Sequence, residues 1–186
     1  MTLNLNKEYW DQRYIENQTG WDVGEITTPL KMYIDQLNSK SIKILIPGGG
    51  NSYEAEYLFT NGFTDITVVD ISPTPLRNLA LRIPDFPPQK LLCEDFFHHQ
   101  GKYDLIIEQT FFCALDPSQR AAYAQKMAYL LAPGGKLAGL LFNTEFESGP
   151  PFGGCRDEYI PFFEPFFKMK IFETCYNSIH PRHGRE

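Results

Sequence analysis

A run of glycines and a single aspartate give the first indication of chemistry in this sequence. Gly48, Gly49 and Gly50 follow the apolar run KILIP, and the segment SYEAEYLF after them has helical spacing. Glycines at such a strand-to-helix turn let the backbone approach a ligand closely, beside the free N–H groups of a helix N-terminus. Asp70 ends the next apolar run, about twenty residues further on, where a carboxylate can accept hydrogen bonds from ribose hydroxyls. The pattern predicts a site for a nucleoside-bearing cofactor.

The glycine pattern also separates two cofactor classes. A dinucleotide site needs G-x-G-x-x-G, because the third glycine lets the helix pack closely beneath a pyrophosphate. Tyr53 occupies that third position here, so we expect a cofactor without phosphate rather than NAD. Asp95, after a third apolar run, would suit an adenine amino group, with Phe96 beside the ring. The spacing alone fits a helix N-cap at Asp95 nearly as well.

Alternating strands and helices must position these residues. Such alternation is typical of βαβ units that build a parallel sheet, whose ligands bind beyond the carboxyl ends of the strands. Prolines at 161 and 165 interrupt the aromatic segment at 159–167, so we expect a short helix or an irregular cap there rather than a long helix. The spacing predicts strands at 43–47, 65–70, 90–95, 103–109, 136–142 and 168–176, and helices at 7–15 (capped by Asn6), 29–37, 52–62, 73–82 and 118–131 (capped by Ser118).

Composition favours one globular domain and argues against several kinds of partner. The 186 residues are 42% hydrophobic and 22% charged, enough for one three-layer core. The net charge is −6, and Lys and Arg are scattered along the sequence. We therefore expect no basic surface that would bind nucleic acid. No run approaches the roughly 20 apolar residues that cross a bilayer, and the first residues lack the core of a secretory signal. We therefore expect a cytoplasmic protein, most simply a monomer, with no membrane partner.

The four cysteines give no sign of a metal or redox site. Cys93, Cys113, Cys155 and Cys175 lie far apart, without the paired short spacing that zinc or a dithiol motif requires. We predict free thiols and no metal.

Several motifs, in order along nearly the whole chain, resemble those of one enzyme family. They are W-x-x-R-Y at 10–14, TGWDVGEITTPL at 19–30, PGGGNSYE at 47–54, VVDIS at 68–72, EDFF at 94–97, EQTFFCAL at 108–115, LLAPGGKLAGLLF at 130–142 and GPPFGG at 149–154. Together they resemble the thiopurine, thiol and halide methyltransferases, which use S-adenosylmethionine. The glycine turn departs from the commoner P-G-C-G-x-G of such enzymes by having Gly49 and Ser52.

The resemblance implies which residues hold the cofactor. Trp10 and Trp21 would close over it, since aromatic faces attract a sulfonium cation and a lid excludes water; packing on the core is the alternative for Trp10. Gln109 matches a cofactor-contacting position where relatives also carry arginine or tyrosine. The implied cofactor-binding set is Trp10, Trp21, Gly48, Gly49, Gly50, Asp70, Ile71, Asp95, Phe96 and Gln109.

The methyl acceptor has weaker candidates. Phe111, Phe112 and Phe152 could form an apolar acceptor pocket, although core packing is the stronger default for such side chains. Arg156 could face an anionic acceptor, although such arginines are more often surface residues. In-line methyl transfer needs mainly proximity, alignment and desolvation of the nucleophile, so a general base need not exist. The sequence identifies no catalytic residue.

The resemblance implies a class I methyltransferase: α/β, doubly wound and three-layered, with a mostly parallel seven-stranded sheet and an antiparallel edge near its end. Residues 1–40 would form an N-terminal helical lid on a sheet core at 41–186, in one domain whose last strand is incomplete. The implied reaction methylates a small soft nucleophile, a thiol, a thiopurine-like compound, a halide or thiocyanate, and releases S-adenosylhomocysteine. Two alternatives stay open: an oxygen or nitrogen acceptor at the same site, and a domain that binds the cofactor without turnover.

Overall fold

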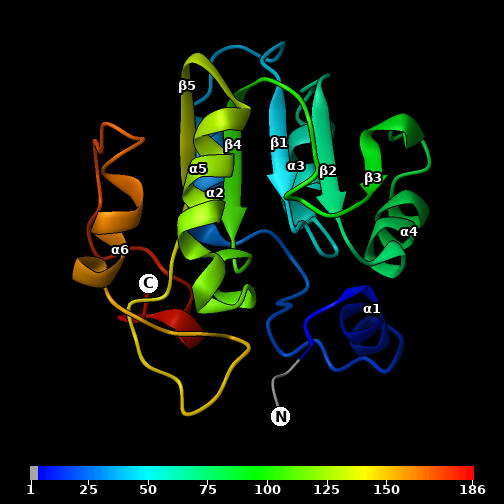
Figure 1. Ribbon diagram of the computed structural model, residues 1–186. Helices are drawn as coiled ribbons and strands as arrows, with labels where there is room; N and C mark the ends of the chain where they lie inside the picture. The colour runs from blue at the N-terminus through cyan, green and yellow to red at the C-terminus, as the bar shows by residue number, and fades with distance from the viewer. Residues whose placement is uncertain (1–3) are drawn as a thin grey trace.

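Five parallel strands form the sheet at the centre of the molecule (Figure 1). The structure is a computed structural model, and it describes residues 4–186. The sheet has the order β3-β2-β1-β4-β5. The chain therefore adds β2 and β3 on one side of β1, and then returns to add β4 and β5 on the other side. Such a reversal leaves a crevice beyond the carboxyl ends of the strands at the switch. The strands are β1 (Ile44–Pro47), β2 (Ile66–Asp70), β3 (Leu91–Cys93), β4 (Tyr103–Gln109) and β5 (Leu131–Leu140).

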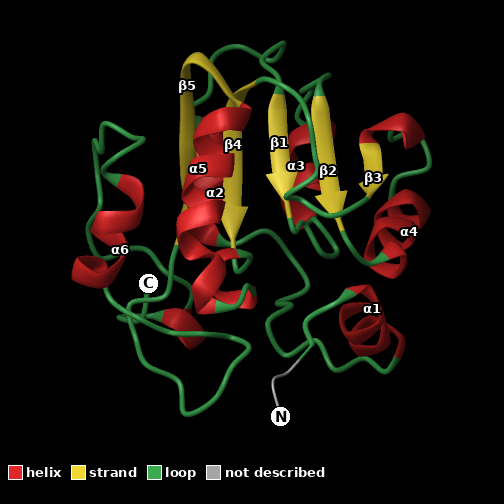
Figure 2. Cartoon of the chain, viewed as in Figure 1, coloured by secondary structure: helices red, strands yellow, loops and turns green. Residues whose placement is uncertain are grey.

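Helices cover both faces of the sheet (Figure 2). Helices α2 (Thr28–Asp35), α3 (Tyr53–Thr60) and α4 (Pro73–Arg82) contribute to one buried cluster, and α5 (Arg120–Leu130) and α6 (Arg156–Phe163) to the other. Within β1, Ile44 and Ile46 belong to the first cluster and Leu45 to the second, because successive strand residues point to opposite faces. A strand buried on both faces must be apolar throughout, as ILIP is.

Helix α1 (Lys7–Ile15) belongs to neither layer. It lies beyond the carboxyl ends of β1 and β2 (Figure 1), and none of its residues is fully buried. The predicted cap is confirmed, since Asn6 Oδ1 accepts a hydrogen bond of 3.0 Å from the Tyr9 N–H. Short 3₁₀ turns occupy Pro88–Lys90, Phe112–Ala114, Pro117–Gln119 and His180–Arg182. No helix within residues 4–186 combines the length and the apolar character needed to span a membrane.

The structure corrects the predicted strand count. Residues 168–176 form no strand, and the described residues make a sheet of five strands rather than seven, without an antiparallel edge strand. Ile171 in this segment is 83% exposed, and although Phe172 packs against Phe163 of α6, no strand of the described sheet pairs with residues 168–176. Within residues 4–186, the antiparallel pairing found is one isolated bridge, between Thr144 and Gly154.

Two predicted element ends were also wrong. Strand β5 begins at Leu131 rather than at 136, because Leu131 already pairs with Tyr103 before an irregularity in the ladder. Ser118 does not cap α5. Instead Asp116 Oδ1 accepts a hydrogen bond of 2.9 Å from the Ser118 N–H, which starts a 3₁₀ turn and delays α5 to Arg120.

Candidate functional site

A cavity of about 570 Å³ opens beyond the carboxyl ends of β1, β2 and β4. Its size is that of a small-molecule or cofactor site. The glycine turn after β1 forms part of its lining, together with Asp70 and Gln109 at the ends of β2 and β4. The other walls come from distant parts of the chain, the N-terminal segment at 5–27 and the loops that carry Phe142, Pro150 and Arg182. The crevice predicted from the strand order is therefore present.

The glycine turn has no room for side chains. Gly48 has a φ of +56° and Gly50 one of +53°, a region that side-chain-bearing residues rarely adopt. A Cβ on Gly48 would lie 2.1 Å from Cδ2 of Phe111, and one on Gly49 would lie 2.7 Å from Cγ1 of Val68. Glycine is required here by both backbone conformation and packing.

We expect Gly48→Ala to destabilise the fold more than Gly62→Ala. Both positions have positive φ, at +56° and +85°, and each substitution should cost about 1 kcal/mol in backbone strain. A methyl group on Gly62 meets open space, whereas on Gly48 it overlaps the Phe111 ring, which adds roughly 1–3 kcal/mol. Urea unfolding of the two variants measures the difference, and equal losses would contradict the packing argument.

Asp70 is buried at the centre of the site. Its Oδ2 accepts a hydrogen bond of 2.8 Å from the Gly50 N–H, and its Oδ1 accepts one of 2.8 Å from the Ser72 N–H. The carboxylate thereby joins the glycine turn to the start of α4 and keeps further lone pairs available. Burial, together with the nearby Asp11 carboxylate, raises the pKa of Asp70 to about 6, against the effect of these hydrogen bonds.

Carboxyl groups outnumber cations around the cavity. Six acidic side chains line it, against two arginines. A cavity lined mainly by one sign of charge favours a ligand of the opposite sign, so the lining suits a cofactor with a net positive charge. The acidic residues are Asp22, Glu25, Glu54, Asp70, Glu94 and Asp95, and the arginines are Arg13 and Arg182.

Aromatic rings from the N-terminal segment border the cavity. The rings of Trp10 and Tyr14 both meet the Trp21 ring edge-on, with centroids 5.7 and 5.9 Å apart. Trp10 and Tyr14 share a face of α1 because they are four residues apart. A Cβ on Gly50 would lie 2.7 Å from the Tyr14 hydroxyl, so Tyr14 packs directly on the glycine turn. Sequence reasoning missed Tyr14, although it ends the W-x-x-R-Y motif.

Helix α1 is fastened to the core through Asp11. Its Oδ1 accepts hydrogen bonds of 2.6 Å from Ser72 Oγ and 3.1 Å from the Thr74 N–H. Asp11 of α1 thus accepts from a free N–H group in the first turn of α4. This contact holds α1 beside the cavity that Trp10 and Asp70 both line.

Sequence reasoning also missed Glu108, a buried carboxyl group in the apolar strand β4. Its Oε1 accepts hydrogen bonds of 2.8 and 2.9 Å from the N–H groups of Phe111 and Phe112. Burial raises the pKa of Glu108 to about 7, and the Glu186 carboxylate adds to the rise. Thr110, which lies between Glu108 and Phe111 in the chain, has a φ of +65°, and this backbone conformation is strained for a β-branched residue. The signal was a carboxylate directly after the apolar run at 105–107, just before a turn with free N–H groups.

The ten residues implied for cofactor binding all line this cavity, from Trp10 and Trp21 to Gln109. Asp95 does so while its Oδ1 accepts a hydrogen bond of 2.8 Å from the Phe97 N–H, so it has the local capping contact as well. Among the acceptor candidates, Phe111 lines the cavity.

The other three acceptor candidates do not line the cavity. Phe112 is 1% exposed and packs between Tyr123 and Tyr159 in the core. The Phe152 ring packs on Gly149. Arg156 is exposed, and its Nε donates a hydrogen bond of 2.9 Å to the Phe172 carbonyl.

Solved structures share this fold. Magnesium protoporphyrin IX methyltransferase from Synechocystis PCC 6803, with bound SAM, superimposes with a TM-score of 0.71 at 13% identity, over 99% of this chain and 95% of that one. The 1,6-didemethyltoxoflavin-N1-methyltransferase from Burkholderia thailandensis, with bound S-adenosylhomocysteine, gives a TM-score of 0.67 at 15% identity, over 86% and 74%. The chain therefore shares the α/β fold of these two methyltransferases.

Sequence comparison identifies the family. Residues 5–186 match thiopurine S-methyltransferase, and the chain belongs to this family. A probable thiol methyltransferase 2 from Arabidopsis thaliana is 32% identical over 95% of this chain and 81% of its own length. Thiocyanate methyltransferase 1 from Brassica oleracea is 29% identical over the same shares. Thiopurine S-methyltransferase from Pseudomonas fluorescens (strain SBW25) is 25% identical over 91% and 87%.

Proposed function

We propose that this enzyme methylates a small soft nucleophile, a thiol or thiolate, with thiocyanate and halides as the close variants. The observation that carries the proposal is the apolar character of the cavity wall beyond Phe111. A wall of this kind removes water from an anionic sulfur and so leaves it more reactive. The apolar residues of the cavity lining include Phe111, Leu115, Phe142, Phe146, Pro150, Pro151 and Pro181. The names of the relatives, which include thiol, thiocyanate and thiopurine methyltransferases, support the same acceptor class.

The proposed cofactor contacts follow from the cavity lining. Asp70 would accept hydrogen bonds from the ribose hydroxyls, the glycine turn would contact the methionine part, and Asp95 and Phe96 would face the adenine. S-adenosylmethionine, when bound, supplies a methyl group on a sulfonium centre. The acidic lining and the rings of Trp10 and Trp21 would hold that positive charge, because carboxylates and aromatic faces both attract cations.

We also propose that the N-terminal segment works as a lid. The described part of the predicted lid that borders the cavity, residues 4–27, is α1 with the loop after it, and both tryptophans of the sequence lie there. Residues 1–3 of the prediction lie outside the described part. We propose further that the enzyme acts as a cytoplasmic monomer on a small-molecule acceptor, in keeping with its net charge of −6.

Product analysis with a methyl-labelled donor tests the acceptor class. We expect S-methyl products from an aromatic thiol, a thiopurine or thiocyanate, and little product from matched phenols and amines. Methylation confined to oxygen or nitrogen would reject the proposal, and S-adenosylhomocysteine binding without any turnover would favour the sensor alternative.

The pH dependence of the rate gives a second, independent readout. Among the described residues that line the cavity, none is a histidine, and the thiolate is the nucleophilic form of a thiol. We therefore expect kcat/KM to rise with pH and to level off near the pKa of each thiol acceptor. Two thiols of different pKa should shift the profile accordingly, whereas one shared inflection would indicate an enzyme base.

A further inference from the structure

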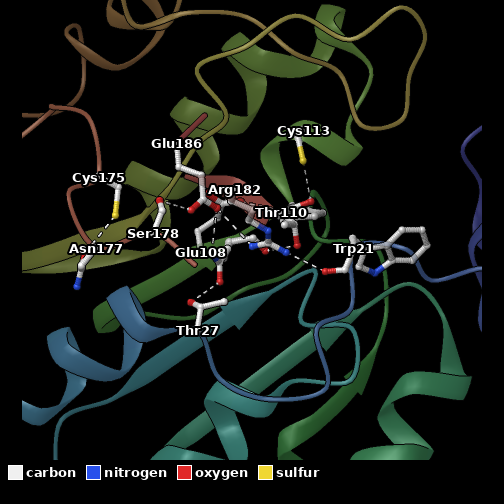
Figure 3. Close-up of polar contacts among 12 residues, drawn as sticks. Trp21, Thr27, Glu108, Thr110, Cys113, Cys175, Asn177, Ser178, Arg182 and Glu186 are labelled. Carbon is white, nitrogen blue, oxygen red and sulfur yellow. Dashed lines mark hydrogen bonds and ion pairs between the residues drawn. The ribbon is translucent and has the colours of Figure 1, made fainter. Parts of the chain in front are cut away.

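A buried set of polar side chains joins the lid to the C-terminal segment (Figure 3). Gln109 lies at its centre, at the end of β4. Its Oε1 accepts a hydrogen bond of 2.8 Å from Thr27 Oγ1, and its Nε2 donates one of 3.2 Å to Glu186 Oε1. Because both ends of the amide are engaged, its orientation is determined by residues of the lid and of the C-terminal segment.

Arg182 makes the second connection. Its Nη2 donates a hydrogen bond of 2.8 Å to the Trp21 carbonyl, and its Nη1 lies 3.4 Å from Glu186 Oε1. Ser178 Oγ donates a hydrogen bond of 2.8 Å to the other carboxylate oxygen of Glu186. Arg182 is 7% exposed and Glu186 6%. Charges this buried are stable only when paired and hydrogen-bonded, so the two side chains depend on each other.

The two connections hold the two ends of one loop. Trp21 and Thr27 are six positions apart, and the residues between them that line the cavity include Asp22, Val23 and Glu25. A loop fixed at both ends cannot lift away from the cavity unless these contacts break.

We propose that Gln109, Arg182 and Glu186 form a clasp that holds the lid loop closed over the cofactor, with Glu186 as its positioning residue. The clasp rests on the proposed function, because it presumes that the lid covers bound cofactor. It also gives Gln109 a role other than the direct cofactor contact expected from the family. Through the clasp, the C-terminal segment sets how long the cofactor stays bound.

Tryptophan fluorescence and cofactor release together test the clasp. The sequence has two tryptophans, Trp10 and Trp21, so intrinsic tryptophan fluorescence reports on the lid alone. Glu186→Gln keeps the size of the side chain but removes the ion-pair partner of Arg182. We expect S-adenosylhomocysteine to dissociate roughly tenfold faster, the typical effect of losing a hydrogen bond to a charged group. Acrylamide should also quench the fluorescence of the complex more strongly.

Matched variants separate the clasp from general effects. Glu173→Gln removes the same charge from an exposed position of the same segment, and it should leave both readouts unchanged. Thr27→Val removes the other connection at nearly constant size, and it should also speed release. The double variant Thr27→Val/Glu186→Gln should fall short of the sum of the single effects, because both act on the same loop.

This test of the clasp does not depend on whether the proposed class of methyl acceptor is correct. Stopped-flow release and quenching use S-adenosylhomocysteine and need no methyl acceptor. If Glu186→Gln lowers the melting temperature but releases the product at the rate of Glu173→Gln, Glu186 is merely structural and the clasp is wrong. Strictly additive effects of the two single variants would also overturn it.

Discussion

Replacing Asp70 with alanine is expected to raise the dissociation constant of S-adenosylhomocysteine about 10- to 100-fold, or roughly 1–3 kcal/mol. The substitution removes the acceptor proposed for the ribose hydroxyls. It also leaves the N–H groups of Gly50 and Ser72 without their carboxylate partner, which loosens the glycine turn. Isothermal titration calorimetry at pH 7.5 measures the change, and Asp85→Ala, on an exposed turn, is the matched control.

The pKa of Asp70 gives this prediction a pH dependence with a definite sign. In the free protein burial raises this pKa to about 6, and hydroxyl donors bind the ionised carboxylate preferentially. Affinity should therefore be constant above pH 7 and fall as the pH decreases through 6 and the carboxylate takes up its proton. Asp70→Ala should flatten that fall. An unchanged affinity in the variant, or a wild-type profile that is flat between pH 5 and 8, would contradict the assignment.

Glu108→Gln is expected to stabilise the protein at pH 8, by about 2–3 kcal/mol. The folded-state pKa of Glu108 is raised from 4.5 to about 7, so the folded protein binds a proton more tightly than the unfolded chain does. Stability must then fall as the pH rises between these two values, and the loss is complete above 7. Glutamine resembles the protonated acid, and its amide oxygen can still accept from the N–H groups of Phe111 and Phe112.

Denaturant unfolding at several pH values tests the Glu108 prediction. At pH 5 the wild-type carboxyl group is mostly protonated, so the variant and the wild type should be close in stability and should diverge toward pH 8. Glu173→Gln, at an exposed position, should show no such divergence. A glutamine variant that is less stable than the wild type at pH 8 would show that the carboxylate is compensated in the folded state.

Local patterns were sufficient for most of the sheet. The fourth strand was predicted at 103–109 and spans Tyr103–Gln109, and the helix after β2 was predicted at 73–82 and spans Pro73–Arg82. Both elements combine an uninterrupted periodic pattern with a clear end, a turn or a proline. The sequence predicted a helix up to 131 and a strand only from 136. Pairing with β4 starts the strand at Leu131 instead. Residues 168–176 were predicted as a strand, but no strand of the described sheet pairs with them, and a local pattern does not supply a partner.

The sequence by itself determined most of the individual strands and helices, the glycine turn and the place of the aspartate at the end of β2, because these depend mainly on residues that are neighbours in the chain. It also determined which strand ends meet, since parallel strands end at one edge. The tertiary structure alone decided the surroundings of Glu108 and the contacts among Gln109, Arg182 and Glu186. The contact between Gln109 and Glu186 joins residues 77 positions apart. Burial, which affects both pairing and pKa, arises only when such distant segments pack together.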